Sequence, residues 1–222
     1  MLITLVKSDT TTPVVTYLTD VLSKHLSSSE SVLWLLSGGS AVPVAVAVAG
    51  RLNPSLLPSL TITLIDERYG PVGHKDSNWQ ALMTAGLTSG ANLLPVLTGA
   101  SLASTVTRWS KELDHALEAA SFRIGLLGIG PDGHTSGILP NSSAVTANGI
   151  VYAYEGGGFE RITTTFETIK RLDEAVVYAI GESKRPVLER LNEDIPLAEQ
   201  PAQILKQLPK TTIFNDQIGE QA

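Results

Sequence analysis

The sequence predicts an α/β fold in which helices cover both faces of a mostly parallel sheet. Short apolar runs of strand length recur along the chain, segments of helical spacing lie between them, and no linker, repeat or low-complexity stretch interrupts the pattern. Apolar strands separated by helices are typical of a parallel sheet that is buried on both faces. We therefore predict a single Rossmann-like domain over residues 1–222.

The first strand is predicted at residues 2–6, and a helix follows it. Thr12 and Pro13 indicate the helix start, because a capping hydroxyl followed by proline suits the first helical turn. One face of this helix then carries Val14, Leu18, Val21, Leu22 and Leu26. Apolar runs predict further strands at residues 32–36, 61–65, 122–128 and 175–180.

A second amphipathic helix is indicated by Val106, Trp109, Leu113 and Leu117, and residues 183–191 form a shorter helical candidate. Residues 43–49 are ambiguous, because their alternation with a period of two favours a strand. They follow directly on a glycine-rich turn after a strand, however, and a parallel neighbour requires a crossover connection, usually a helix. We therefore predict a helix there.

Composition excludes several classes of protein. The net charge is −6 and no cluster of Lys and Arg occurs, so a nucleic-acid partner is not expected. The absence of cysteine excludes disulfides, thiol nucleophiles and cysteine metal sites. No apolar run reaches the roughly 18 residues that span a bilayer, and the first apolar run is too short for a signal-peptide core. We expect a cytoplasmic protein without a membrane partner.

The first loop that suits chemistry follows the strand at 32–36 and consists of Ser37, Gly38, Gly39 and Ser40. Two glycines let the backbone approach a ligand closely, and the following helix would direct N–H donors at an anion. These residues are predicted to bind phosphate, although a plain tight turn would have the same composition.

The second loop follows the strand at 61–65 and begins with Asp66, Glu67 and Arg68. Consecutive charged residues at a strand end are costly to bury without partners. Arg68 offers a planar fork of donors that suits a phosphate or a carboxylate. Since ligands bind at the carboxyl ends of strands in open α/β sheets, a binding role is favoured over a surface loop with internal ion pairs.

The third loop follows the strand at 122–128 and contains Asp132 and His134 among several glycines. Histidine suits proton transfer near neutral pH, because its unperturbed pKa is about 6.5. Asp132 would orient the imidazole or accept a proton itself. We predict that both residues are catalytic.

Other sites are less well supported by the pattern. Asp66, His74 and His134 could form a metal site, but their spacing does not demand one, and no metal is predicted. No Gly-x-Ser-x-Gly elbow occurs at a strand–helix turn. The glycines at 128, 130 and 133 fit a dinucleotide fingerprint only superficially, because no helix start follows them.

Together these loops resemble the 6-phosphogluconolactonase family, within a larger group that includes glucosamine-6-phosphate deaminase. The similar segments span nearly the whole chain in the family's order: residues 36–40, 66–68 with 77–78, 128–135 with 139–140, 160–165, 181–184 and a C-terminal helix at 197–205. Two departures occur, since Pro43 lies one residue late and Gly137 stands where a small polar residue is usual.

The resemblance implies hydrolysis of 6-phospho-D-glucono-1,5-lactone without a cofactor, with His134 as general base and Asp132 or the loop backbone holding its ring. It implies that the substrate is held by Ser37, Gly38, Gly39, Ser40, Asp66, Arg68, Arg161 and Lys184. The deaminases carry a Glu before the proline of the third loop, where this chain has Leu139, and they typically have a Tyr at the position of Arg68. Both differences favour a lactonase.

Three alternatives to the lactonase stay open at this point. They are an aminosugar-6-phosphate deaminase or isomerase, a non-catalytic sugar-phosphate-sensing module, and, least favoured, a dinucleotide-binding dehydrogenase. The retained pair of Asp132 and His134 favours an enzyme over a sensor. We expect a monomer or a homodimer.

Overall fold

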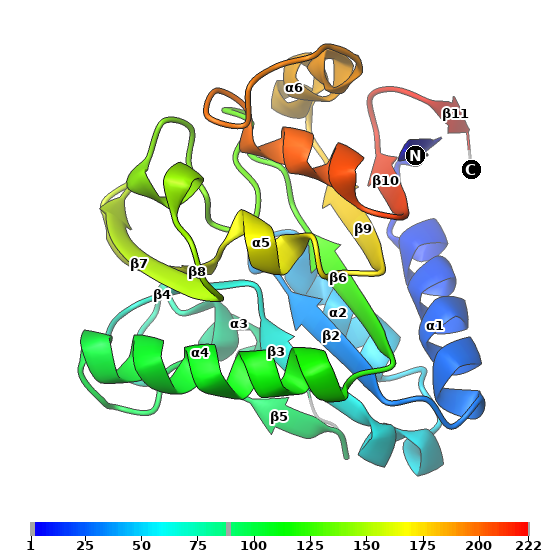
Figure 1. Cartoon of the computed structure of the whole chain (residues 1–222). Helices are drawn as coiled ribbons and strands as arrows, with labels where there is room; N and C mark the ends of the chain where they lie inside the picture. Colours follow the sequence, from blue (N-terminus) through cyan, green and yellow to red (C-terminus); the bar gives the residue numbers. More distant parts are fainter. Residues whose placement is uncertain (1–2, 88–89, 222) are drawn as a thin grey trace.

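The computed structural model describes residues 3–87 and 90–221, and it confirms the predicted α/β architecture (Figure 1). Within these residues, the main sheet has eight strands in the order β11-β1-β10-β9-β6-β2-β3-β5, and all neighbouring strands are parallel. A second, three-stranded sheet with the order β4-β8-β7 is antiparallel. The fold is therefore mostly parallel, with a small antiparallel addition at one side.

The strands are β1 (Ile3–Lys7), β2 (Val32–Leu36), β3 (Leu60–Leu64), β4 (Asp66–Arg68), β5 (Asn92–Leu94), β6 (Phe122–Leu127), β7 (Val151–Gly156), β8 (Phe159–Thr164), β9 (Glu174–Ala179), β10 (Thr211–Asn215) and β11 (Glu220–Gln221). The α-helices are α1 (Thr12–Ser27), α2 (Ala41–Ala49), α3 (Asn78–Thr84), α4 (Leu102–Ala119), α5 (Phe166–Ile169) and α6 (Arg185–Glu189). Short 3-10 helices lie at Pro54–Ser59, Ser143–Thr146, Glu182–Lys184, Arg190–Asn192 and Pro201–Gln207.

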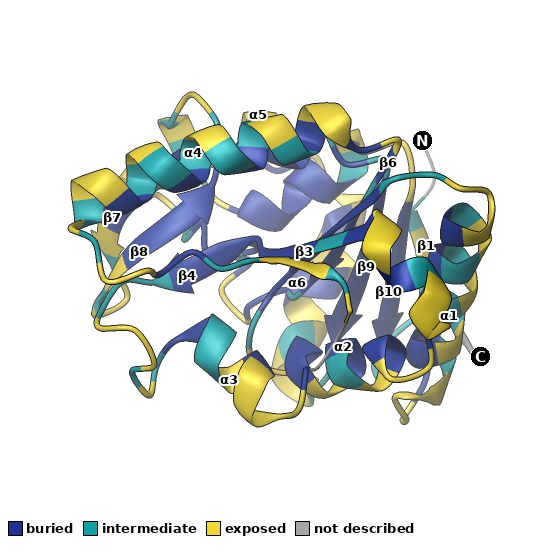
Figure 2. Cartoon of the chain, turned by 90° about the horizontal axis from the view of Figure 1, so that it is seen from below, coloured by how far each residue is buried: buried dark blue, intermediate teal, exposed yellow. Residues whose placement is uncertain are grey.

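Helices cover both faces of the main sheet. Figure 2 shows α4 and α5 on one face and α1, α2 and α3 on the other. Every residue of β2 and of β9 is buried, as a strand with a helix layer on each side requires. Trp34 of β2 and Trp109 of α4 are fully buried and belong to one continuous hydrophobic cluster.

The predicted strands are confirmed to within one residue at each end. The strand expected at 32–36 is β2, and those expected at 61–65, 122–128 and 175–180 are β3, β6 and β9. The strand expected at 2–6 is β1, although Leu2 lies outside the described residues. Here the strand length of the apolar runs and the helical segments between them together identified the central strands.

The ambiguous segment at 43–49 is helical, as predicted from its position in the chain. Ala41, Val44, Ala45 and Val48 are fully buried at helical spacing in α2. In the fold, α2 packs against both α1 and α3. The parallel arrangement of the strands requires a helical crossover after β2, and this requirement predicted the structure better than the period-two pattern, which favours a strand.

The start of α1 differs in detail from the prediction. The helix does begin at Thr12, with Pro13 in its first turn, but its N-cap residue is Thr11, and the side chain of Thr11 makes no capping hydrogen bond. Proline with its fixed φ is thus the effective start signal. The predicted apolar face is buried at Val14, Leu18, Leu22 and Leu26, and half-buried at Val21.

The helices expected near the C-terminus are shorter or tighter than predicted. Residues 183–191 are divided among two 3-10 helices and α6, which has Pro186 in its first turn. The helix that the resemblance implied at 197–205 is a 3-10 helix at Pro201–Gln207. Both segments end up packed against each other, since Gln203 Nε2 donates to the carbonyl oxygen of Arg190 at 3.0 Å.

The small antiparallel sheet was not anticipated from the sequence. Its two longer strands, β7 and β8, form a hairpin in which Gly156 pairs with Phe159. Gly157 and Gly158 have φ values of 61° and 81°, as a two-residue hairpin turn of the mirror-image type requires. A Gly-Gly pair between two strand-like runs is a recognised hairpin signal, so this element was predictable in principle.

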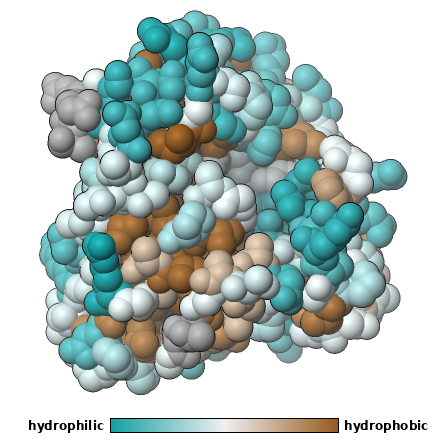
Figure 3. Space-filling model, turned by 180° about the vertical axis from the view of Figure 1, so that it is seen from behind, coloured by the Kyte–Doolittle hydropathy of each residue, from teal (hydrophilic) through white to brown (hydrophobic). Residues whose placement is uncertain are grey.

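Seen from behind, the surface is hydrophilic around its upper part, with apolar side chains gathered lower down (Figure 3). Among the described residues, the large hydrophobic side chains exposed to solvent are those of Val72, Met83 and Leu93. In the same residues no helix is both long and apolar enough to cross a membrane.

Candidate active site

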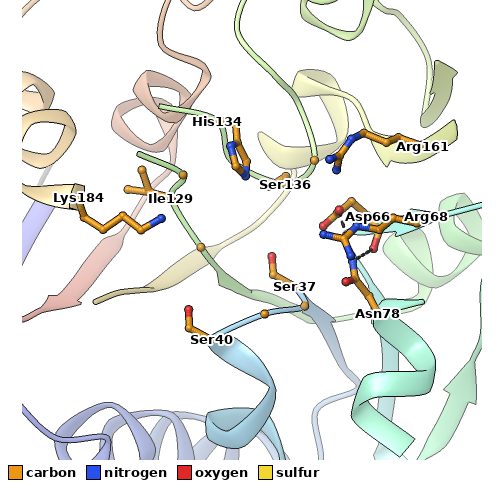
Figure 4. A pocket seen from close by; sticks show the side chains of 15 residues that line it. Ser37, Ser40, Asp66, Arg68, Asn78, Ile129, His134, Ser136, Arg161 and Lys184 are labelled. Carbon is orange, nitrogen blue, oxygen red and sulfur yellow. Dashed lines mark hydrogen bonds between the residues drawn. The ribbon is translucent and has the colours of Figure 1, made fainter. Parts of the chain in front are cut away.

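A pocket opens at the carboxyl ends of β2, β3 and β6, where the three loops meet (Figure 4). It is lined by Ser37, Gly38, Gly39, Ser40, Asp66, Arg68, Asn78, Gly128, Ile129, Gly130, His134, Ser136, Gly137, Arg161 and Lys184. The structure thus brings together all predicted binding residues and His134. Asp132 does not line the pocket but contacts the imidazole that does.

The first loop turns sharply between β2 and α2. Gly39 has a φ of 63°, which glycine adopts without strain. A Cβ atom on Gly38 would lie 1.9 Å from Oδ1 of Asn78, so the first and second loops touch there and only glycine fits. Ser37 is buried, and its Oγ has no hydrogen-bond partner in the protein. A hydroxyl in that state is available to a ligand.

The second loop carries a buried carboxylate that points away from the pocket. Glu67 is fully buried and accepts hydrogen bonds from the backbone N–H groups of Arg68, Asn78 and Trp79 at 2.7, 2.7 and 3.1 Å, and from Oγ of Ser77 at 2.8 Å. Burial raises the pKa of Glu67, and these hydrogen bonds oppose the shift. Glu67 thereby ties β4 to the start of α3, a role that sequence reasoning missed.

Asp66 turns its carboxylate toward the pocket although the residue is 6% exposed. Burial raises its pKa above the ordinary value, and the positive charges of Arg68 and Arg161 act in the opposite direction. The amide of Asn78 also donates to the backbone oxygen of Asp66 at 2.9 Å and to its Oδ2 at 3.4 Å. Because burial removes water from this carboxylate, a hydrogen bond donated by a ligand hydroxyl would stabilise its charged form.

Arg68 and Arg161 enter the pocket from neighbouring strands. They are direct partners in the antiparallel register of β4 and β8. Arg68 Nη1 donates to the carbonyl oxygen of Asp76 at 3.0 Å, and Arg161 Nε donates to that of Gly156 at 2.8 Å. Only the family resemblance predicted Arg161 at the site. The pairing of β8 with β4 is what brings its side chain beside Arg68.

Lys184 approaches from another side of the pocket. It lies in the 3-10 helix that follows β9, and Figure 4 shows it across the pocket from Arg161, with His134 between them. Burial lowers the pKa of Lys184, and the negative charge of Asp132 opposes the shift. The pocket therefore has cationic groups on two sides of the imidazole.

The third loop is fixed by hydrogen bonds within the chain. Thr135 Oγ1 donates to the carbonyl oxygen of Gly128 at 2.8 Å, and the backbone N–H of Gly130 donates to the carbonyl oxygen of His134 at 2.8 Å. Tyr154 of β7 donates its phenolic proton to the carbonyl oxygen of Gly137 at 2.6 Å. The third loop is thus held by the small antiparallel sheet as well as by the main one.

His134 and Asp132 form a close pair. His134 Nδ1 lies 2.6 Å from Asp132 Oδ1, and the backbone N–H of His134 donates to the same oxygen at 3.2 Å. Partial burial raises the pKa of Asp132, but the charge of His134 and these hydrogen bonds outweigh it, so the pKa lies below its ordinary value. An ionised carboxylate only accepts hydrogen bonds, so Nδ1 carries the proton and Nε2 is the basic nitrogen.

Ser136 and Asn78 are pocket residues that the sequence did not single out. Ser136 is buried, has a φ of 53°, and its Oγ has no hydrogen-bond partner in the protein. Asn78 belongs to one of the segments that resemble the family, and its side chain contacts both Gly38 and Asp66. Neither has a sequence signal of its own, because a single Ser or Asn in a loop is ordinary.

A metal-binding group is not evident in the part of the chain that the structure describes. Among those residues, no three or more His, Asp or Glu side chains are arranged to hold a metal ion. His74 Nε2 lies 2.9 Å from the backbone oxygen of Arg68, and it supports the second loop.

Comparisons with known proteins identify the family of this chain. The family model described as glucosamine-6-phosphate isomerases/6-phosphogluconolactonase matches residues 6–214. The 6-phosphogluconolactonase of Homo sapiens is 28% identical over 177 residues, which cover 72% of this chain and 67% of the human protein. That of Helicobacter pylori is 27% identical over 188 residues, covering 76% and 82% of the two chains.

Two solved structures share the fold over almost their whole length. A 6-phosphogluconolactonase from Thermotoga maritima has a TM-score of 0.82 at 22% identity, with 96% of this chain and 98% of that chain covered. One from Shewanella baltica also has a TM-score of 0.82, at 19% identity, covering 100% and 98%.

Proposed function

This chain belongs to the glucosamine-6-phosphate isomerase/6-phosphogluconolactonase family, and we propose that it hydrolyses 6-phospho-D-glucono-1,5-lactone to 6-phosphogluconate. The observation that carries the proposal is the pair of His134 and Asp132 beside a pocket with cationic side chains on two sides. A general base and a site for an anion are what hydrolysis of a phosphorylated lactone requires. The names of the curated relatives support the same activity.

In the proposed reaction, His134 acts as general base. Its Nε2 takes a proton from a water molecule, whose oxygen attacks the lactone carbonyl carbon. The bond from that carbon to the ring oxygen then breaks, and the imidazolium returns the proton to the ring oxygen. Asp132 holds the imidazole in the required tautomer and stabilises its charge while the proton is bound.

The phosphate group is proposed to supply binding energy at a distance from the reacting carbon. The hydroxyls and N–H groups at residues 37–40, together with Arg68, Arg161 and Lys184, are the groups that would hold it. Asp66 is proposed to accept a hydrogen bond from a sugar hydroxyl. Fixing the phosphate positions the carbonyl near His134, so that binding energy is used for orientation.

The isomerase or deaminase branch of the family is less well supported. Leu139 stands where those enzymes were expected to have a carboxylate, and leucine cannot move a proton. Its backbone N–H donates to the hydroxyl oxygen of Tyr154 at 3.2 Å, so its place in the loop is fixed. The sensing module is disfavoured by the basic nitrogen that faces the pocket.

The test is a hydrolysis assay with 6-phosphoglucono-δ-lactone generated in situ, compared with spontaneous ring opening. We expect opening well above background and no ammonia from glucosamine 6-phosphate. Background rates with the lactone would reject the proposal, and ammonia release would reassign the chain to the deaminases. The expectations of a cytoplasmic location and of a monomer or homodimer stay predictions.

A further inference from the structure

We propose that Phe159 is a positioning residue whose ring holds the guanidinium groups of Arg68 and Arg161 side by side, ready for the anionic group of the substrate. The inference rests on the proposed function only in naming that anion as a sugar phosphate. It assigns a role to a side chain that does not line the pocket itself.

The two arginines pose an electrostatic problem. They lie directly opposite each other in the register of β4 and β8, where like charges destabilise a pair of strands. Among the described residues, no carboxylate forms an ion pair within 4.0 Å with either of them. The negative charge of Asp66 and one backbone carbonyl each attract the two side chains, but none of these contacts joins one guanidinium to the other.

The ring of Phe159 supplies such a contact to both. Its centroid lies 5.4 Å from Cζ of Arg68 and 5.6 Å from Cζ of Arg161. Both distances are within the roughly 6 Å at which the face of an aromatic ring attracts a cation. One half-buried phenyl ring therefore attracts two cations that repel each other.

The backbone fixes this ring in its place. Phe159 lies two residues before Arg161 on β8, so both side chains point to the same face of the small sheet. Phe159 pairs with Gly156 across the tight turn at Gly157 and Gly158, and this pairing fixes the backbone position from which the ring projects. The ring is thus attached to the most constrained part of the hairpin.

Each arginine also has one backbone anchor and keeps free donors. The anchors are the carbonyl oxygens of Asp76 for Arg68 and of Gly156 for Arg161. Arg68 Nε is buried without a hydrogen-bond partner in the protein. Two guanidiniums that are already in position lose little side-chain freedom when an anion binds, and this raises affinity.

The test compares Phe159→Leu, which removes the ring, with Phe159→Tyr, which keeps it. We expect Phe159→Leu to raise KM for the phosphorylated lactone and to weaken binding of inorganic phosphate by about fivefold to thirtyfold. This follows because each exposed cation–π contact is worth a factor of roughly two to five. We expect kcat to change little, and Phe159→Tyr to stay near the wild type.

Two further measurements separate positioning from a loss of structure. In an Arg161→Ala background, Phe159→Leu should add much less than it does alone, because the ring acts through the arginines. Tyr152→Leu, which removes a half-buried ring from the neighbouring strand β7, should leave phosphate affinity unchanged. If Phe159→Leu does not fold, progressively fluorinated phenylalanines at position 159 should weaken binding stepwise at constant shape.

The outcomes distinguish this inference from the proposed function. An active wild type whose KM and phosphate affinity are unchanged by Phe159→Leu, or by ring fluorination, overturns the inference and leaves the lactonase in place. A wild type without lactonase activity whose phosphate affinity still depends on the ring rejects the lactonase and supports the positioning role.

Discussion

Oδ1 of Asp132 lies 2.6 Å from Nδ1 of His134, although the two residues are separated by only one position in the chain. The contact is possible because Gly133 between them has a φ of 87° and turns the backbone back on itself. A Cβ atom on Gly130 would lie 2.0 Å from the same Nδ1, so a second glycine makes room for the ring. Gly130 and Gly133 thus allow the contact between Asp132 and the imidazole of His134.

Replacement of His134 by alanine should lower kcat by about 10² to 10⁴, the usual contribution of a general base. Binding of the product 6-phosphogluconate should stay nearly intact, since other residues of the pocket are proposed to hold the phosphate. The measurement is lactone hydrolysis together with product binding by calorimetry. His115→Ala, on the exposed face of α4, is the control. An equal loss of turnover and product binding would make His134 structural.

Replacement of Asp132 by asparagine should lower kcat by about tenfold to a hundredfold, less than loss of the base itself. The amide can donate to Nδ1, which favours the tautomer with the proton on Nε2, where it blocks proton uptake. The pKa of Asp132 is depressed, so the wild-type pair keeps its carboxylate in mildly acidic solution. A pH–rate profile checks this, and an unchanged kcat would remove Asp132 from the mechanism.

Arg161→Ala should chiefly raise KM, by about tenfold to a hundredfold, as expected for loss of a hydrogen bond to a charged group. The rise should shrink at high salt, because the exposed part of the interaction is screened. The control is Arg171→Ala, which breaks an ion pair with Asp114 at 2.7 Å outside the pocket. A KM equal to that of the wild type would exclude Arg161 from the phosphate site.

Asp66→Asn should stabilise the protein at neutral pH while lowering its activity. The pKa of Asp66 is raised in the folded state, mainly by burial, so folded protein binds more protons than unfolded protein between the two pKa values. Stability therefore falls as pH rises from the unfolded value through the raised folded one, by about 1.4 kcal/mol per pKa unit. Urea unfolding from pH 3 to 8 should show this slope in the wild type and a weaker one in the variant. A less stable variant at pH 7 would contradict the assigned cause.

Ser136→Gly should raise the free energy of unfolding by about 1 kcal/mol, because serine is strained at a φ of 53°. The same change should lower kcat/KM about twofold to tenfold, since the unpartnered hydroxyl is free to bond the substrate. Asn141→Gly, at a φ of 55°, is the matched control and should gain less, because asparagine tolerates this conformation. Unchanged kinetics would show that the hydroxyl is not used.

The sequence was most informative where one physical requirement dominated. The apolar runs of β2 and β9 predicted central strands, and every residue of both strands is buried. The helix α2 followed from the crossover that parallel strands require. The three loops at the strand ends were predictable as one pocket because parallel strands share a carboxyl edge.

The rest depended on contacts between distant segments. Nothing in the run of Asp66, Glu67 and Arg68 tells that the middle carboxylate turns inward to bind the backbone of α3 while its neighbours face the pocket. Alternation along β4 produces that division, but β4 was not predicted as a strand. Likewise, the place of Phe159 between two arginines depends on the register of β4 with β8, which no local pattern specifies.

The close approach of Gly38 to Asn78 has a consequence for protein engineering. Since a methyl group at position 38 would overlap the amide at position 78, these two positions cannot be randomised separately. A library that diversifies the first loop to change substrate preference would lose most of its members to this clash. Joint variation, with a smaller residue at 78 whenever 38 is enlarged, would keep the two loops compatible and open a larger set of pockets to selection.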